Sequence, residues 1–365
     1  MGSVLGIVII NAYDNIHVKY LLKSIFSQNY DEYTIYIVNV GTNLEYFIEK
    51  HYKEYANRIN IFNLRKDFGP SNQRNIGTYL ALRDGNEYVL YLDNDTYMHD
   101  RKLLSKLVEA MEHSDDEIVG MSPLILNIDK TLQWGGAYMI NGLIYEILSE
   151  QEMPSLEKYC TFFIHGAAFI VRAKILKYLA NKIGLFRIFN PKAFIGFDDY
   201  EFCLKVYSTI PESKFIIDKN IEIIHRGSSI TPRISPWRLY HAIKNFYYIS
   251  SYFQRGYKNA VLYKMISQYF LLSMLRSRYD LKLFKPLLNG ISYIIKSSYM
   301  ETYPDVVIPR KILLKKIVGC RSTTNILFSD FSSLDKLCKN KHALKIIKGI
   351  IRKWWKDEEL LVQRF

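Results

Sequence analysis

The sequence predicts an α/β protein whose mostly parallel sheet is flanked by helices. Short runs of β-branched, aromatic and aliphatic residues recur along the first hundred residues, with segments of helical apolar spacing between them. This strand–helix alternation, repeated three times, is the signature of βαβ units. Ligands of such sheets bind outside the carboxyl ends of the strands. Several of the predicted strands end in polar residues, so the pattern predicts a ligand site at these ends.

The predicted elements follow one another closely along the chain. Strands are expected at residues 4–10, 33–40, 59–64 and 88–92, with helices at 20–26, 44–56 and 72–82. The first of these strands is apolar throughout, which is typical of a parallel sheet covered on both faces. Farther on, a helix is expected at 103–111, strands at 118–122, 215–218 and 221–224, and a helical pattern after the acidic residues near position 200.

The composition excludes several classes of protein. With 49% hydrophobic and 23% charged residues, the chain has material for a core and is not disordered. Its four cysteines show neither zinc-ligand spacing nor a disulfide framework, which fits a reducing compartment. No apolar run approaches the ~20 residues of a membrane-spanning helix, and residues 4–10 are too short for a signal peptide. We therefore expect a cytoplasmic protein, soluble or peripheral on the inner face of the membrane.

The positive charge is concentrated in the last third of the chain. From residue 251 onward there are 22 Lys and Arg against 8 Asp and Glu, a local net charge of +14, whereas the whole chain carries +13. We therefore expect a catalytic domain over residues 1–245 and a helical, basic region over residues 246–365. In the latter, helices are expected at 247–257, 260–278 and 281–298.

A basic amphipathic pattern lies near the C-terminus. Apolar residues recur at helical spacing from Leu344 to Trp354, and basic residues lie largely between them. Such a helix is typical of a membrane-surface element, although a packed helical subdomain with solvated Lys residues explains the pattern equally well. No zinc finger, RRM signature or recognition helix accompanies the charge, so a nucleic-acid partner is not expected.

Two carboxylates follow the predicted fourth strand. Asp93 and Asp95 are separated by one residue, so in an extended chain their side chains point the same way and reach a common point. Carboxylate oxygens suit Mg²⁺ or Mn²⁺ carrying a phosphate. A turn explains the same residues without a metal, because Asp and Asn favour turns.

Further motifs follow in order. Small residues at Gly166-Ala167-Ala168 mark a close approach by a ligand or by a packed helix. Acids at Asp198, Asp199 and Glu201 open a helix, where capping explains them as well as chemistry does. A later strand ends at His225.

Taken together, these motifs resemble those of the family 2 glycosyltransferases, especially the rhamnosyltransferase-like and galactofuranosyltransferase-like members. The resemblance covers roughly residues 4–250. It rests on Asp93-Asn94-Asp95, Gly166-Ala167-Ala168-Phe169, Asp198-Asp199-Tyr200-Glu201, His225 and Arg74-Asn75-Ile76-Gly77. It implies a GT-A fold that binds the nucleotide within residues 1–100 and the acceptor within residues 120–230.

The resemblance implies an inverting, metal-dependent transfer of one sugar from a UDP, dTDP or GDP donor to a hydroxyl of a glycan or lipid-linked acceptor. Asp199 would be the general base, with Asp198 and Glu201 positioning the acceptor or the base. Asp95 and His225 would ligate Mn²⁺ or Mg²⁺, with Asp93 touching the metal or the ribose. The Gln-x-x-Arg-Trp element of processive synthases is absent, so we expect addition of one or a few sugars.

Binding residues are implied on both sides of the site. The nucleotide-binding candidates are Asn11, Tyr13, Asn39, Lys66, Arg74, Asp93 and Asn94. Arg74 or Lys66 would pair with phosphate oxygens. Asn39 stands where the family often has Asp, which leaves the base preference open. The acceptor-side candidates are Trp134, His165, Gly166 and Ala167.

Two other functions stay open. A nucleotidyltransferase shares the sheet and the paired Asp, but it would carry a Gly-rich, basic loop after the first strand, where this chain has Asn-Ala-Tyr-Asp at residues 11–14. A degenerate domain serving as a basic peripheral membrane scaffold would show no metal-dependent nucleotide binding.

Overall fold

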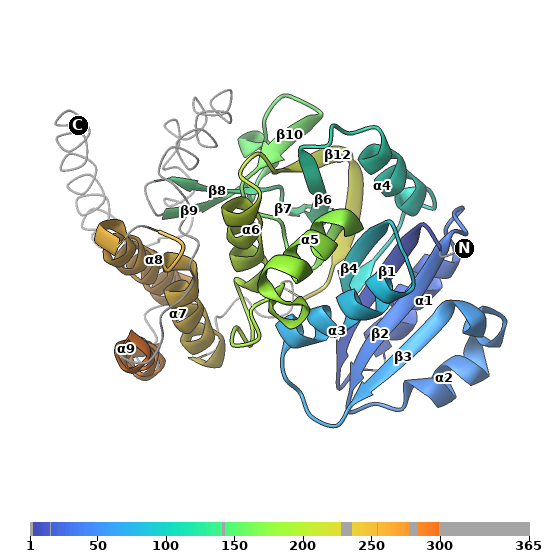
Figure 1. The fold of residues 1–365 in the computed structure, drawn as a ribbon, viewed down its shortest axis with the longest axis horizontal. Coiled ribbons are helices and arrows are strands. Elements are labelled where there is room, and N and C mark those ends of the chain that lie inside the picture. Colours follow the sequence, from blue (N-terminus) through green and yellow to red (C-terminus); the bar gives the residue numbers. More distant parts are fainter. Residues whose placement is uncertain are drawn as a thin grey trace.

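A computed structural model describes residues 3–14, 16–140, 143–227, 236–253, 255–276 and 283–298 of the chain. Its centre is a mixed sheet, with helices α3 and α5 lying in front of it in Figure 1. The elements occur in the order β1 (Leu5–Ala12), α1 (Ile16–Phe26), β2 (Tyr33–Val40), α2 (Leu44–His51), β3 (Ile59–Leu64), α3 (Pro70–Arg83), β4 (Tyr88–Asp93), β5 (Thr96–Tyr97), α4 (Leu103–Glu112), β6 (Ile118–Leu126), β7 (Leu132–Trp134), β8 (Ala137–Ile140), β9 (Leu143–Glu146), β10 (Lys158–Thr161), β11 (Ala168–Arg172), α5 (Ala173–Ile183), α6 (Asp198–Thr209), β12 (Lys214–His225), α7 (Pro236–Ser250), α8 (Arg255–Arg276) and α9 (Phe284–Ser298).

The order of the strands brings the predicted motifs to one edge of the sheet. The strands lie in the order β10-β12-β6-β11-β4-β1-β2-β3, and β4, β1, β2 and β3 are parallel. Strand β11 runs antiparallel to β4, so its first residue, Ala168, pairs with Leu92 near the end of β4. Strands β6 and β12 are parallel to each other and antiparallel to β11. The ends of β4 and β12 therefore meet the beginning of β11.

Helix α3 packs very closely on the sheet beside this edge. The strands β1 and β2 are almost wholly buried. A Cβ atom added at Gly77 would lie 2.2 Å from Cγ1 of Val8, a distance that real side chains do not adopt. The glycine thus lets α3 lie directly on β1, and it carries Arg74, one turn earlier, to the strand ends.

The predicted strands at 33–40 and 59–64 are confirmed at both ends. The helix expected at 44–56 is shorter, because a 3₁₀ helix (Lys53–Arg58) follows α2. The strands expected at 215–218 and 221–224 form one strand, β12, whose register shifts between Asp218 and Glu222. A β-bulge of this kind interrupts the pattern of a strand without ending it.

The first helix of the C-terminal part begins at Pro236 instead of residue 247, so the expected boundary at 245 falls inside α7. Proline is favoured at the first position of a helix. Helices α7, α8 and α9 gather at the left of Figure 1, beside the hairpin of β8 and β9. Phe246 of α7 packs against Phe197, with ring centroids 4.8 Å apart, and the buried residues of α7 belong to the core of the sheet.

Among the described residues, none of the helices combines the length and the apolar character needed to cross a bilayer. The basic amphipathic pattern from Leu344 to Trp354 lies outside the described residues.

Candidate active site

Asp93, Asp95 and His225 come together at the strand ends. One potential ligand atom from each of them lies within 4.8 Å of the others, and Nε2 of His225 is 3.3 Å from Oδ1 of Asp95. The two-residue strand β5 explains the encounter, because Thr96 pairs with His225 across the antiparallel β5–β12 ladder. The chain turns directly after Asp93 and delivers Asp95 to the end of β12.

This cluster fits a divalent cation. Two carboxylates and an imidazole are ligands that Mn²⁺ accepts. A Cβ atom added at Gly227 would lie 2.7 Å from Oδ2 of Asp95 and 2.9 Å from Nε2 of His225, so the glycine keeps room for an ion beside both ligands. Although burial opposes both shifts, the pair lowers the pKa of Asp95 and raises the pKa of His225. A bound cation would take the place of the proton that Nε2 of His225 holds next to Asp95.

Gln133 orients His225, a contact that the sequence did not reveal. Oε1 of Gln133 lies 3.1 Å from Nδ1 of His225. Because an amide oxygen only accepts hydrogen bonds, Nδ1 carries the proton and donates it. Gln133 lies on β7, which pairs with the end of β6. Its effect is to fix the ring so that Nε2 points towards Asp95.

Arg74 lies inside the site and contacts carboxylates. Its side chain is 4% exposed and donates through Nη1 to Asp198 and through Nη2 to Asp93 (3.0 Å) and the carbonyl of Gly166 (2.9 Å). Asp93 therefore has one oxygen engaged with Arg74. Burial raises the pKa of Asp93 to about 6, against the opposing charge of Arg74.

Asp199 is a carboxylate placed for proton transfer near neutral pH. Its Oδ2 accepts the N–H of Gly166 at 2.6 Å, and its Oδ1 accepts the N–H of Tyr200 at 2.9 Å. Burial raises its pKa to about 7, and the neighbouring Asp198 adds to the shift while Arg74 opposes it. A general base works best when its pKa lies near the working pH.

Gly166 leaves little room for a side chain at this point. A Cβ atom there would lie 3.1 Å both from Nη2 of Arg74 and from Oδ2 of Asp199. The small residues in the segment before β11 thus permit a close approach of these two side chains.

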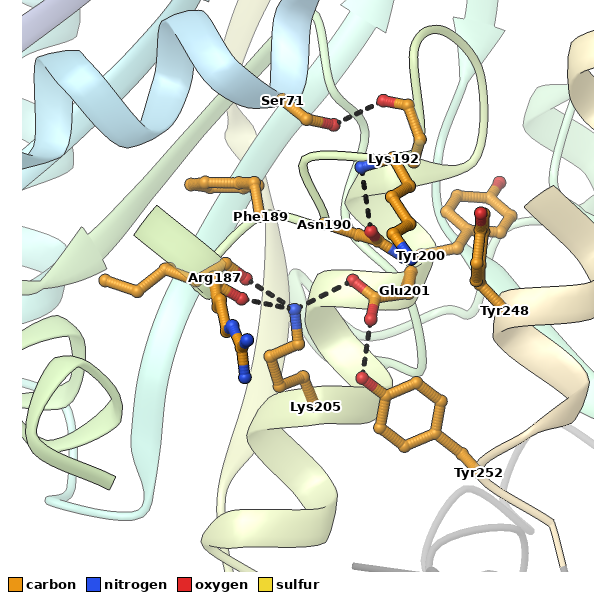
Figure 2. Close-up of polar contacts among 12 residues, drawn as sticks. Ser71, Arg187, Phe189, Asn190, Lys192, Tyr200, Glu201, Lys205, Tyr248 and Tyr252 are labelled. Carbon is orange, nitrogen blue, oxygen red and sulfur yellow. Dashed lines mark hydrogen bonds and ion pairs between the residues drawn. The ribbon is translucent and has the colours of Figure 1, made fainter. Parts of the chain in front are cut away.

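Glu201 points in a different direction from Asp199. Figure 2 shows its carboxylate in the interior, where Oε2 pairs with Lys205 at 3.1 Å and Oε1 accepts the Tyr252 hydroxyl at 2.5 Å. Lys205 also donates to the carbonyls of Arg187 and Ile188, at 2.6 and 3.0 Å. The acids of one helical turn therefore separate: Asp198 and Asp199 enter the site, whereas Glu201 fastens α6 to the segment after α7.

The polar residues at the ends of β1, β2 and β4 form a chain of amides. Asn94 donates to Asn11 at 2.7 Å, and Asn11 donates to Asn39 at 2.8 Å. Asn39 in turn donates to Asn63 at 2.7 Å and to the carbonyl of Thr42, and its oxygen accepts from Asn11 and from the Thr42 hydroxyl. Two donated and two accepted bonds use the full capacity of this amide. Asn39 thus ties the strand ends together.

The remaining nucleotide candidates are exposed. Tyr13 has a positive φ of 59° and lies over Gly41, where a Cβ atom would be 2.3 Å from its ring. Lys66 lies on the surface, 6.0 Å from the ring of Phe68, and is not brought into the carboxylate cluster.

The acceptor-side candidates adjoin the cation cluster. His165 lies between Trp134 and His225, at ring distances of 5.2 and 5.8 Å. Its Nδ1 accepts the N–H of Ala167 at 3.1 Å, and burial lowers the pKa of its imidazole to about 3. His165 is therefore neutral, with its proton on Nε2. The Tyr200 hydroxyl donates to Glu146 of the hairpin at 2.5 Å.

Comparisons with known proteins show what the chain resembles in sequence and in fold. The sequence profile described as Glycosyl transferase family 2 matches residues 7–179. No curated protein sequence matches the chain. Residues 1–349 of TarS from S. aureus share the fold with a TM-score of 0.52 at 15% identity, over 89% of this chain and 90% of that one. GalNAc-T7, crystallised with UDP, GalNAc and Mn²⁺, gives a TM-score of 0.51 at 18% identity, over 81% of this chain and 58% of that one.

Proposed function

The chain is a glycosyltransferase of GT-A fold with a family 2 domain at residues 7–179, and from this premise we propose an inverting, metal-dependent reaction. One sugar moves from a nucleotide-diphosphate donor to a hydroxyl of a glycan or lipid-linked acceptor. The observation that carries the proposal is the placement of Asp199, whose pKa is raised to about 7, beside the glycine that also contacts Arg74. The same Arg74 binds Asp93 of the cation cluster.

Asp199 acts on the acceptor. It takes the proton of the acceptor hydroxyl, whose oxygen forms a bond to the anomeric carbon of the donor. The bond from that carbon to the diphosphate breaks, and the nucleotide diphosphate leaves with the electron pair. A single displacement of this kind inverts the configuration at the carbon.

Asp93, Asp95 and His225 hold Mn²⁺ or Mg²⁺ in this proposal. When bound, the ion acts as a Lewis acid that stabilises the charge of the departing diphosphate. Gln133 keeps Nε2 of His225 available to the ion by accepting from Nδ1. The amide chain from Asn94 to Asn39 keeps the strand ends at a fixed spacing beneath the nucleotide.

The donor is proposed to be a UDP, dTDP or GDP sugar. A uridine nucleotide has support from TarS, which shares the fold and whose residues 1–349 were crystallised with UDP-GlcNAc, and from GalNAc-T7 with UDP and Mn²⁺. His165 offers a neutral Nε2–H donor on the acceptor side. A lipid-linked acceptor would also fit the basic charge after residue 250, which attracts an anionic membrane surface.

Calorimetric titration tests the donor site. UDP, GDP and dTDP are titrated into the protein with Mn²⁺ and again with EDTA. We expect micromolar binding of one nucleotide that disappears on chelation, and Asp95→Ala should weaken it strongly. Failure of all three nucleotides to bind would contradict the proposal and favour a degenerate scaffold.

The stereochemistry and the partner are tested separately. Proton NMR of the product formed with the selected donor should show the anomer opposite to that of the donor; retention would refute the single displacement. Sedimentation with vesicles of anionic and of neutral lipid tests the membrane surface, and equal binding to both would contradict the electrostatic argument.

A further inference from the structure

Arg74 has a position that phosphate binding does not explain. An arginine that binds phosphate would keep its guanidinium exposed to the ligand, whereas the side chain of Arg74 is 4% exposed and donates to groups of the protein itself. Its three contacts reach three separate segments: the end of β4, the turn before β11 and the beginning of α6. These segments belong to the two halves of the site.

Three carboxylates surround the guanidinium of Arg74, and their negative charges would be unbalanced without it. Asp93, Asp198 and Asp199 lie close enough to interact with Arg74 electrostatically. Asp93 and Asp198 are bound directly, and Asp199 is reached through Gly166, whose carbonyl accepts from Arg74 and whose N–H donates to Asp199. One buried cation thus serves three carboxylates.

We propose that Arg74 is a positioning residue that holds the base Asp199 in register with Asp93 of the donor site. The inference rests on the proposed function, in which Asp199 is the base. Arg74 contacts neither donor nor acceptor; it acts by fixing Asp198 directly and Asp199 through the peptide of Gly166. The donor half and the acceptor half are in this way joined by one side chain.

Only arginine suits this role. A planar guanidinium carries five N–H groups in a rigid fork and so can bridge carboxylates on opposite sides, whereas lysine presents one ammonium point charge. Lysine at position 74 would keep the charge and lose some of the contacts. A misplacement of about 1 Å at a catalytic group is enough to lower a rate about 100-fold.

The test compares Arg74→Lys with Arg172→Lys in the full chain. Arg172 is a matched control, because its guanidinium is also buried and donates to the carbonyls of Ile118, Met111 and Ser114. It lies at the last residue of β11, at the opposite end of that strand from Gly166. Three quantities are measured: the melting temperature, the Kd of UDP in the presence of Mn²⁺, and kcat as a function of pH with UDP-GlcNAc as the donor. If the titration shows that GDP or dTDP binds instead of UDP, that nucleotide and its sugar conjugate replace UDP and UDP-GlcNAc.

We expect Arg74→Lys to bind the nucleotide within about 3-fold of the unchanged protein while kcat falls about 100-fold. The acidic limb of the kcat profile should move to higher pH. Lysine keeps the charge but loses contacts that hold it in place, so the charge opposes the raised pKa of Asp199 less well. Arg172→Lys should lower the melting temperature and leave kcat and its pH profile unchanged.

Other outcomes overturn the inference. Nucleotide affinity that falls as much as kcat/KM would identify a donor ligand, and an equal loss of kcat in both variants would identify a general structural role. If Arg74→Lys fails to fold, Asp198→Asn is used instead, because it removes the carboxylate that Nη1 of Arg74 binds. It should lower kcat and leave the nucleotide Kd unchanged. Asp199→Asn separates the two proposals. Transfer that survives Asp199→Asn refutes the base, whereas loss there with normal turnover in Arg74→Lys refutes only the positioning role.

Discussion

Replacing Asp199 by Asn should stabilise the folded protein above neutral pH while it stops transfer. Burial, with the charge of Asp198, raises the pKa of Asp199 from 3.8 to about 7. The folded protein therefore disfavours the charged carboxylate. Three pKa units correspond to on the order of 4 kcal/mol of folding free energy. Asn removes this cost because it carries no charge at any pH.

The sign and the pH window follow from the raised pKa. A carboxyl with a raised pKa binds its proton more tightly in the folded state, so its contribution to stability is present below pH 4 and is lost as the pH rises to about 7. Part of the gain is offset, because Gly166 and Tyr200 each donate an N–H to one oxygen of Asp199, and an amide has only one oxygen. The lost acceptor costs about 1–2 kcal/mol.

The net gain above pH 7 is therefore about 2–3 kcal/mol, which raises the melting temperature of a domain of this size by roughly 4–6 °C. Thermal unfolding followed by circular dichroism between pH 4 and pH 8.5, in EDTA, measures it. The difference between the two proteins should grow from pH 4 to pH 7 and then stay constant. Asp198→Asn is the contrast, because it removes the carboxylate that pairs with Nη1 of the buried Arg74 and should destabilise. An Asp199→Asn melting temperature that is unchanged or lower at pH 8 would refute the reasoning.

Three further predictions concern the neighbours of the site. Gln133→Leu should weaken Mn²⁺ binding about 10–100-fold, because the ring of His225 loses the hydrogen bond that orients it. Electron paramagnetic resonance of free Mn²⁺ measures the affinity. An affinity equal to that of the unchanged protein would show that the amide does not orient the ring. Glu201→Gln should lower the free energy of unfolding by about 3–5 kcal/mol, because it leaves the buried Lys205 without its carboxylate partner. Urea unfolding measures this, and the double variant Glu201→Gln, Lys205→Met should recover much of the loss. A double variant as unstable as Glu201→Gln alone would speak against a paired charge. Gly166→Ala should lower kcat at least about 10-fold because its Cβ displaces Asp199, and unchanged turnover would mean that the site can relax around a methyl group.

Several features of the site could be predicted from local pattern. Asp93 and Asp95 were expected to reach a common point because side chains two residues apart in an extended chain point the same way. His225 was added as a third ligand by the family resemblance, and the structure brings one potential ligand atom of each residue within 4.8 Å of the others. The position of Asp199 at the beginning of a helix was expected from the acids before the apolar spacing. The family profile at residues 7–179 confirms the resemblance on which the reaction type was proposed.

Other features could not be read in this way, because they depend on contacts between distant residues. Arg74 or Lys66 was expected to pair with phosphate oxygens, and the structure buries Arg74 among carboxylates that lie 19 and 124 positions away. Glu201 and Asp199 stand two residues apart and share a motif, yet Asp199 enters the site, whereas Glu201 pairs with Lys205 one turn later on the same helix and accepts from Tyr252, which lies 51 positions away. The first C-terminal helix was expected to begin at residue 247, whereas α7 begins at Pro236 and its buried apolar residues pack in the core of the sheet.

The sequence by itself determined the fold class and the edge where chemistry can occur, because strand periodicity and the order of the motifs are local properties of the chain. Only the tertiary structure decided which polar groups face the site and which form hydrogen bonds or ion pairs with other groups of the protein. Hydrogen bonds and charges are short-ranged and saturable, so the role of Asn39, Arg74 or Gln133 depends on which partner the fold brings within about 3 Å. That partner cannot be read from the neighbours along the chain.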